Sequence, residues 1–70
     1  MIELHTRAEI EDAVHNYIIG RNAERDRRVV LRRLIDGITY ETLAEEFDMS
    51  DRQIKRIVYK AVDKISKKLR

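Results

Sequence analysis

The chain has 70 residues, of which 40% are charged, and it contains no cysteine and no proline. The absence of cysteine excludes a disulfide framework and a thiolate metal site, so helix packing must stabilise this small chain. No apolar run approaches the roughly 20 residues of a membrane span, and no signal-peptide pattern opens the sequence. The sequence therefore predicts one small all-α domain over residues 1–70, located in the cytoplasm.

Charge is distributed unevenly along the chain, although the net charge is only +2. Residues 51–70 contain eight Lys or Arg and two acids, whereas residues 1–50 contain seven Arg and eleven acids. The last part of the chain therefore carries +6 and the rest −4. Such segregation is typical of a surface that meets a polyanion, but a solvated helix surface can have the same composition.

A first helix is predicted over residues 7–19. Thr6 and Glu9 have the spacing of a capping box, in which each side chain accepts a hydrogen bond from the other residue's backbone amide. Gly20 can adopt the left-handed conformation that ends a helix. Apolar residues recur at helical spacing at Ile10, Val14, Tyr17 and Ile18. At the end of this helix, Tyr17, Ile18 and Ile19 form either part of the core or an exposed apolar patch.

A second helix is predicted over residues 23–36. Asn22 is its candidate N-cap, and Glu24 and Asp26 lie in the first turn, where the helix dipole favours acids. Gly37 ends it. Its apolar side consists of Val30, Leu31, Leu34 and Ile35.

A short helix over 40–47 and a long one over 51–68 complete the predicted four-helix fold. Thr39 is the cap of the short helix, and Ser50 with Gln53 forms a second capping box at the start of the long one. The long helix keeps apolar residues at helical spacing through Ile54, Ile57, Val58, Ala61, Val62 and Ile65.

Residues 39–60 meet the requirements of a helix-turn-helix. Two helices joined by a short turn need a small residue where they touch, and Ala44 occupies that position. The turn needs a residue that tolerates positive φ, and Asp48 is among the better alternatives to glycine. Apolar residues fill the angle between the helices at Leu43, Phe47, Met49, Ile54 and Ile57. The second helix, starting at Ser50, is therefore predicted to lie in the DNA major groove.

The outward side of this recognition helix supplies the candidate DNA contacts. Residues in its first turns reach base edges, so we expect base reading by Asp51, Arg52, Lys55 and Arg56. Arginine can bond guanine through two N–H groups, and Asp51 can accept from a cytosine amino group. An acid at this position also favours the helix dipole whatever lies outside. Contacts to the DNA backbone are expected from Thr39, Tyr40, Thr42, Ser50, Tyr59 and Lys60.

The stretch from Arg27 to Ile65 resembles region 4 of bacterial sigma factors. The helix before the motif, the Gly-Ile-Thr-Tyr-Glu segment from Gly37 and the Ala-x-x-Lys-Ile tail from Ala61 carry this resemblance. The similarity covers about residues 25–69. The chain is also similar to small stand-alone regulators of phages and mobile elements, which contain little beyond this module.

The resemblance implies a role in transcription. In the family, region 4 recognises the promoter −35 element and docks on the flap of RNA polymerase, which makes double-stranded DNA and RNA polymerase the expected partners. Asp51 stands where primary sigma factors often have a basic residue, so the usual −35 preference is not expected. The chain has no room for the region that melts promoter DNA, and we expect it not to be a complete sigma factor.

The sequence allows two other functions to be weighed against DNA binding. A protein-interaction module, binding a partner through residues 7–35, is the main alternative, and association into a homodimer is left open. An enzyme is disfavoured because no nucleophile with its base is evident. Glu11 and His15 have the spacing of two metal ligands on a helix, but no third ligand is identifiable, so neither a metal nor a cofactor is expected.

Overall fold

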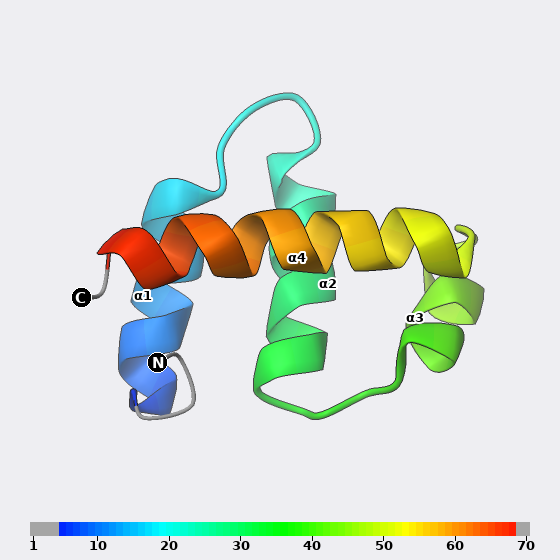
Figure 1. Cartoon of the computed structure of the whole chain (residues 1–70), viewed down its shortest axis with the longest axis horizontal. Helices are drawn as coiled ribbons and strands as arrows, with labels where there is room; N and C mark the ends of the chain where they lie inside the picture. The colour runs from blue at the N-terminus through cyan, green and yellow to red at the C-terminus, as the bar shows by residue number, and fades with distance from the viewer. Residues whose placement is uncertain (1–4, 69–70) are drawn as a thin grey trace.

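The computed structural model describes residues 5–68, which form four helices and no strand. The helices are α1 (Arg7–Tyr17), α2 (Ala23–Leu34), α3 (Tyr40–Glu46) and α4 (Asp51–Lys68). Helices α1 and α2 run antiparallel side by side, and α4 crosses both, with the short α3 beside its N-terminal end (Figure 1). The predicted all-α fold with a helix-turn-helix is therefore confirmed.

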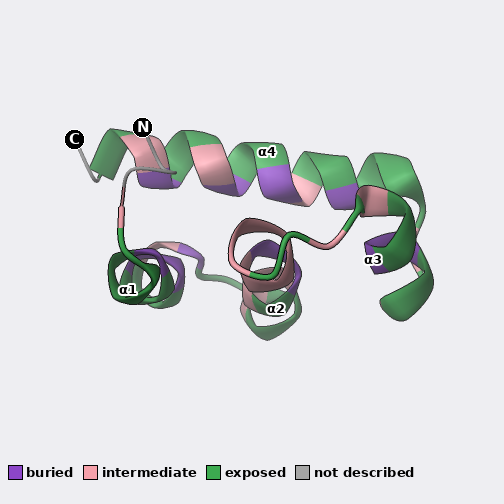
Figure 2. Cartoon of the chain, turned by 90° about the horizontal axis from the view of Figure 1, so that it is seen from below, coloured by how far each residue is buried: buried purple, intermediate pink, exposed green. Residues whose placement is uncertain are grey.

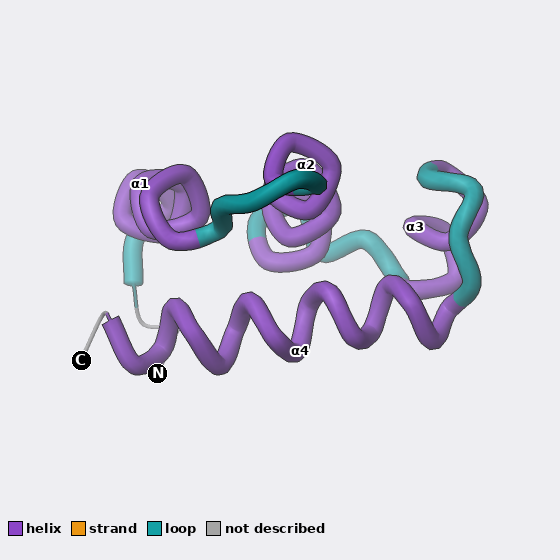
Figure 3. The backbone as a smooth tube through the Cα atoms, turned by 90° about the horizontal axis from the view of Figure 1, so that it is seen from above, coloured by secondary structure: helices purple, strands orange, loops and turns teal. Residues whose placement is uncertain are grey.

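Helix α4 forms one layer of the molecule and the other three helices form the second layer (Figure 3). The side of α4 that faces the other helices is buried, whereas the opposite side is exposed along most of its length (Figure 2). The buried residues of α4 are Ile54, Val58, Ala61 and Ile65. This arrangement leaves one long side of α4 available for a partner.

The core consists of two clusters that meet on α4. The first lies between α1, α2 and α4 and contains Ile10, Ala13, Val14, Ile18, Val30, Ala61 and Ile65. The second lies between α2, α3 and α4 and contains Val29, Leu43, Ala44, Ile54 and Val58. Half-buried Ile57 and Val62 pack against both clusters. Helix α4 therefore links the helix-turn-helix to α1.

Helix α2 contributes to both clusters, which changes its predicted apolar side. Val30 is fully buried as expected, but Val29, which the sequence pattern did not include, is also fully buried. Val29 belongs to the second cluster and Val30 to the first. Because α2 lies between α1 and α3, two of its sides are covered, and the remaining predicted residues, Leu31, Leu34 and Ile35, are only half-buried.

The capping box of α1 is formed as predicted. The Thr6 amide donates to Glu9 Oε1 at 3.0 Å, and the Glu9 amide donates to Thr6 Oγ1 at 3.2 Å. The bond from the Thr6 amide is the main cause that holds the pKa of Glu9 below its ordinary value, and bonds to the Thr6 hydroxyl and to His5 add to it. Glu9 is therefore charged in its capping role near neutral pH.

Three helices end earlier than the sequence predicts. Helix α1 stops at Tyr17 because Ile18 takes an extended conformation, with φ −96° and ψ 103°, and enters the first cluster. Helix α2 ends at Leu34 and α3 at Glu46. At the start of α2, Asn22 occupies the N-cap position but its side chain makes no capping hydrogen bond. Within residues 5–68, no helix is long and apolar enough to cross a membrane.

Candidate nucleic-acid interface

The turn between α3 and α4 begins with a Schellman motif. The Met49 amide donates to the Ala44 carbonyl at 2.9 Å, and the Asp48 amide points to the Glu45 carbonyl at 3.4 Å. Asp48 has a φ of 54°, the left-handed conformation that this motif requires. Asp48 thus adopts the positive φ that the sequence predicted it to tolerate. This conformation turns the chain sharply enough for α4 to pack across α3.

Ser50 and Gln53 form the predicted capping box at the start of α4. The Ser50 amide donates to Gln53 Oε1 at 2.9 Å, and the Gln53 amide donates to Ser50 Oγ at 3.1 Å. The Ser50 hydroxyl also donates to Gln53 Oε1, at 3.2 Å. The hydroxyl hydrogen is therefore already used within the cap and is not free to bond a phosphate. The main role of Ser50 is to cap the start of α4.

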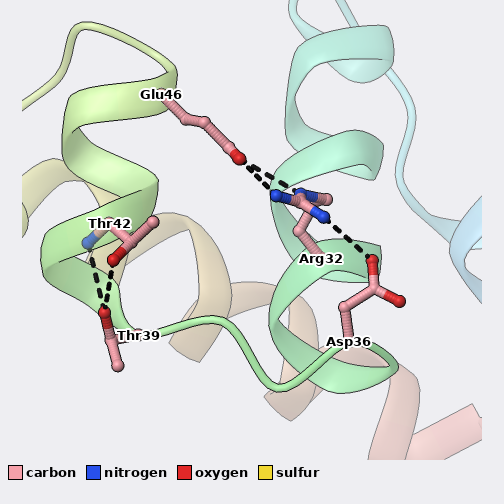
Figure 4. A network of polar contacts seen from close by, with 5 residues as sticks. All are labelled: Arg32, Asp36, Thr39, Thr42 and Glu46. Atoms are coloured by element: carbon pink, nitrogen blue, oxygen red, sulfur yellow. Dashed lines mark hydrogen bonds and ion pairs between the residues drawn. The ribbon is translucent and has the colours of Figure 1, made fainter.

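The hydroxyl groups of the two threonines at the start of α3 have different roles in their hydrogen bonds (Figure 4). The Thr42 amide donates to Thr39 Oγ1 at 3.2 Å, and the Thr39 hydroxyl donates to Thr42 Oγ1 at 2.9 Å. Thr39 thus accepts the capping bond from the Thr42 amide, as predicted for an N-cap residue, and its hydroxyl hydrogen is used in the bond to the Thr42 hydroxyl. The Thr42 hydroxyl only accepts in this pair, so its own hydrogen remains available to a phosphate oxygen.

The exposed side of α4 carries cations that no acid neutralises. Within residues 5–68, the side chains of Arg52, Lys55, Arg56 and Lys60 form no ion pair, and all four residues are exposed. Asp51 and Tyr59 are exposed beside them, with Tyr59 59% exposed. The structure thus places the predicted base-reading residues on one surface, which we call the α4 surface (Arg52, Lys55, Arg56 and Lys60, with Asp51 and Tyr59).

Cations elsewhere in the described chain more often have acidic partners. Arg7 donates to Glu11 at 3.1 Å on α1, and Lys67 lies 3.4 Å from Asp63 near the end of α4. The first of these pairs also occupies the carboxylate that the sequence grouped with His15. These paired cations lie outside the α4 surface, whereas the four cations of the α4 surface form no ion pair among the described residues and keep this surface positive.

Tyr40 connects three helices through its ring. The Arg33 guanidinium on α2 lies 4.3 Å from the ring centroid, and the Lys55 ammonium on α4 lies 5.8 Å from it. The ring of Tyr59 meets Tyr40 edge-on, at 6.1 Å between centroids and 87° between planes. Arg33 also donates to the Ile38 carbonyl at 3.1 Å. Sequence reasoning missed Arg33, because helical spacing alone does not show which aromatic ring a distant cation will meet.

Arg32 makes a second connection between α2 and α3 (Figure 4). Its Nε donates to Glu46 Oε2 at 3.1 Å and a terminal nitrogen donates to Glu46 Oε1, while the other terminal nitrogen lies 3.3 Å from Asp36. This two-bond contact holds the pKa of Glu46 below its ordinary value and raises that of Arg32. Isolated surface ion pairs contribute little to the stability of the fold, but bidentate pairs in a network contribute more.

The fold defines a helix-turn-helix domain, with α3 as the first helix of the motif and α4 as the second. The family model described as Sigma-70, region 4 matches residues 23–67. Because this match covers well over half of the chain, the protein belongs to the sigma-70 region 4 family, as the sequence resemblance indicated. No curated protein and no solved structure matches the chain.

Family membership establishes the general role. Sigma-70 region 4 is a family of DNA-binding domains with a regulatory part in transcription, and it is not a family of enzymes. The match begins at Ala23, the first residue of α2, and ends in the last turn of α4. Helix α1 therefore lies outside the matched residues, although it supplies three residues of the first core cluster.

Proposed function

We propose that this protein regulates transcription by binding double-stranded DNA sequence-specifically, with the N-terminal turns of α4 in the major groove. The observation that carries this proposal is the α4 surface, whose four cations form no ion pair in the part of the chain that the structure describes. Arg52 and Arg56 lie one turn apart and can each bond a guanine through two N–H groups. Asp51 is proposed to reach a base at the edge of the same surface.

Contacts to the sugar-phosphate backbone are proposed on either side of these residues. Thr42 offers a free hydroxyl hydrogen at the start of α3, and Tyr59 and Lys60 extend the α4 surface toward its middle. Ser50, Thr39 and Tyr40 act from the same edge, the first two chiefly by capping the helices. Such contacts position the protein on DNA without carrying sequence information.

The first experiment compares Arg52→Ala and Arg56→Ala with the wild type on a duplex selected from a random DNA pool. If these arginines read bases, each substitution weakens binding by about 1–3 kcal/mol and relaxes the preference at one position. Lys67→Ala is the matched control, because Lys67 lies on the same helix but pairs with Asp63. Affinity that stays at the wild-type level in both arginine variants contradicts the proposed base readers.

Salt dependence supplies an independent measurement of the same proposal. Each phosphate that a cation neutralises adds about −0.9 to the slope of log affinity against log salt concentration. We expect a steep slope for the wild type. No binding to any duplex, even at low salt, would refute DNA binding by this chain. A selected sequence with twofold symmetry would indicate that the protein binds as a homodimer.

We also propose RNA polymerase as a second partner, and this proposal rests on the family match. It corresponds to the protein-interaction function that the sequence left as an alternative. Arg52→Ala separates the two functions: it is expected to lose DNA affinity while still co-sedimenting with core polymerase. Loss of both at once, in a folded variant, contradicts separate contact surfaces. The kinship with small phage and mobile-element regulators stays a prediction.

A further inference from the structure

The Lys55 side chain is held at one edge of the α4 surface. Its ammonium lies 5.8 Å from the centre of the Tyr40 ring, which belongs to the first turn of α3. Lys55 also lines a hollow of about 330 Å³ together with Arg33, Thr39, Tyr40, Glu41 and Asp51. The ammonium therefore lies near the start of α3.

The Tyr40 ring is itself fixed from two other directions. Arg33 lies closer to it than Lys55 does, at 4.3 Å, and is anchored by its bond to the Ile38 carbonyl. Tyr59 meets it edge-on. Tyr40 is also half-buried against the second core cluster. A ring held in this way is a rigid platform for a flexible lysine side chain, since a cation near an aromatic face is attracted by the ring's quadrupole.

Position decides what a lysine can do on DNA. In a helix-turn-helix the first helix crosses the backbone while the N-terminal residues of the second helix meet base edges. A cation held beside the start of α3 therefore meets phosphate, whereas the same cation extended from α4 meets a base edge. A lysine on phosphate adds affinity equally for all sequences.

We infer that Tyr40 is a specificity-determining positioning residue, whose ring holds Lys55 as a backbone cation and so leaves base selection to the neighbouring arginines. This inference rests on the proposed function and replaces the base-reading role that the sequence gave to Lys55. The structural observation behind it is the ring-to-ammonium contact across α3 and α4, which exists in the free protein.

The test combines Tyr40→Phe, which keeps the ring, Tyr40→Leu, which removes it, and Lys55→Ala. As a single substitution, Lys55→Ala should weaken binding to all duplexes equally. It should also reduce the slope of log affinity against log salt concentration by about 0.9. Tyr40→Leu should create a new preference at the base pair that the released Lys55 side chain reaches. Adding Lys55→Ala to Tyr40→Leu should remove this new preference. Tyr40→Phe should keep the wild-type preference. A purely structural role for Tyr40 would change affinity without changing base preference.

Three results would overturn the inference: a changed base preference in Lys55→Ala alone, an unchanged preference in Tyr40→Leu, or Tyr40→Phe behaving as Tyr40→Leu. Lys60→Ala is the matched control, because Lys60 is an exposed lysine of α4 that makes no cation–π contact among the described residues. Its effect should add to that of Tyr40→Leu, whereas the effect of Lys55→Ala should not.

A measurement without DNA separates failure of the inference from failure of the proposed function. The ring current of Tyr40 should shift the side-chain proton resonances of Lys55 in the free protein, and the shift should persist in Tyr40→Phe and vanish in Tyr40→Leu. The same spectra show whether each variant is folded. Absence of the shift in the wild type overturns the inference alone. A wild-type protein that shows the Lys55 shift but binds no DNA would contradict the proposed function. The specificity role of Tyr40, which rests on that function, would then be contradicted too.

Discussion

At the scale of single residues, Asp48 has an unusual backbone conformation for a residue with a side chain. It is the non-glycine residue with positive φ, at 54°, within residues 5–68, and it allows the Schellman motif that ends α3. Asp tolerates this conformation better than most residues because its short polar side chain can bond locally. Glycine tolerates it without any steric cost, so the turn retains a small amount of strain.

We expect substitutions of Asp48 to change stability in the order of their tolerance for positive φ. Asp48→Ala should lower the free energy of unfolding by about 1 kcal/mol, because a Cβ in the left-handed region is strained without local compensation. Asp48→Gly should raise it slightly. Urea unfolding followed by circular dichroism measures both. If the alanine variant is as stable as the glycine variant, the turn does not depend on this backbone conformation.

At the scale of helices, α1 depends on a charged cap. Glu9 has a pKa below its ordinary value because the Thr6 amide and hydroxyl bond its charged form. Its stabilising contribution is therefore present above the pKa of the unfolded chain and is lost as pH falls through the lower, folded value. We expect Glu9→Gln to remove this part of the acid destabilisation, since the amide can accept the same bond without titrating.

Unfolding in urea at about pH 7 and about pH 3 tests this expectation. Stability lost between the two conditions should be smaller in Glu9→Gln than in the wild type. Glu24→Gln is a suitable control, because Glu24 is an exposed acid in the first turn of α2 without a hydrogen-bond partner among the described residues. Equal acid sensitivity of the wild type and Glu9→Gln contradicts the role of the Glu9 charge.

The helices also show how far the sequence could predict the structure. The caps at Thr6, Thr39 and Ser50 were predictable because each bonds a residue three positions away. The contact from Arg32 to Glu46 spans 14 positions and depends on how α2 and α3 pack, so local spacing could not show it. The same limit applies to Tyr40 and its two cations. The early end of α1 has a similar cause, since Ile18 leaves the helix to enter the core.

At the scale of the whole molecule, α4 links stability to the proposed DNA binding. Its outward side forms the α4 surface, and its inward side belongs to both core clusters. Ile54 anchors the cluster of the helix-turn-helix, and Ile65 anchors the cluster that contains α1. Both are fully buried. A continuous helix that joins the two clusters leads us to predict that the chain unfolds as a single cooperative unit.

The prediction is tested by Ile54→Val and Ile65→Val. Each substitution should lower the free energy of unfolding by about 0.5–1.5 kcal/mol, because it removes a buried methylene and leaves a small cavity. Urea unfolding followed by NMR at amides of α1 and α3 should show the same midpoint shift for both helices in each variant. Ile19→Val is the control, because Ile19 is 69% exposed and should shift neither. A shift of α1 alone in Ile65→Val would mean that the two clusters unfold separately. With a common shift, α1 supports the proposed DNA binding although it lies outside residues 23–67, because it stabilises the fold that presents the α4 surface.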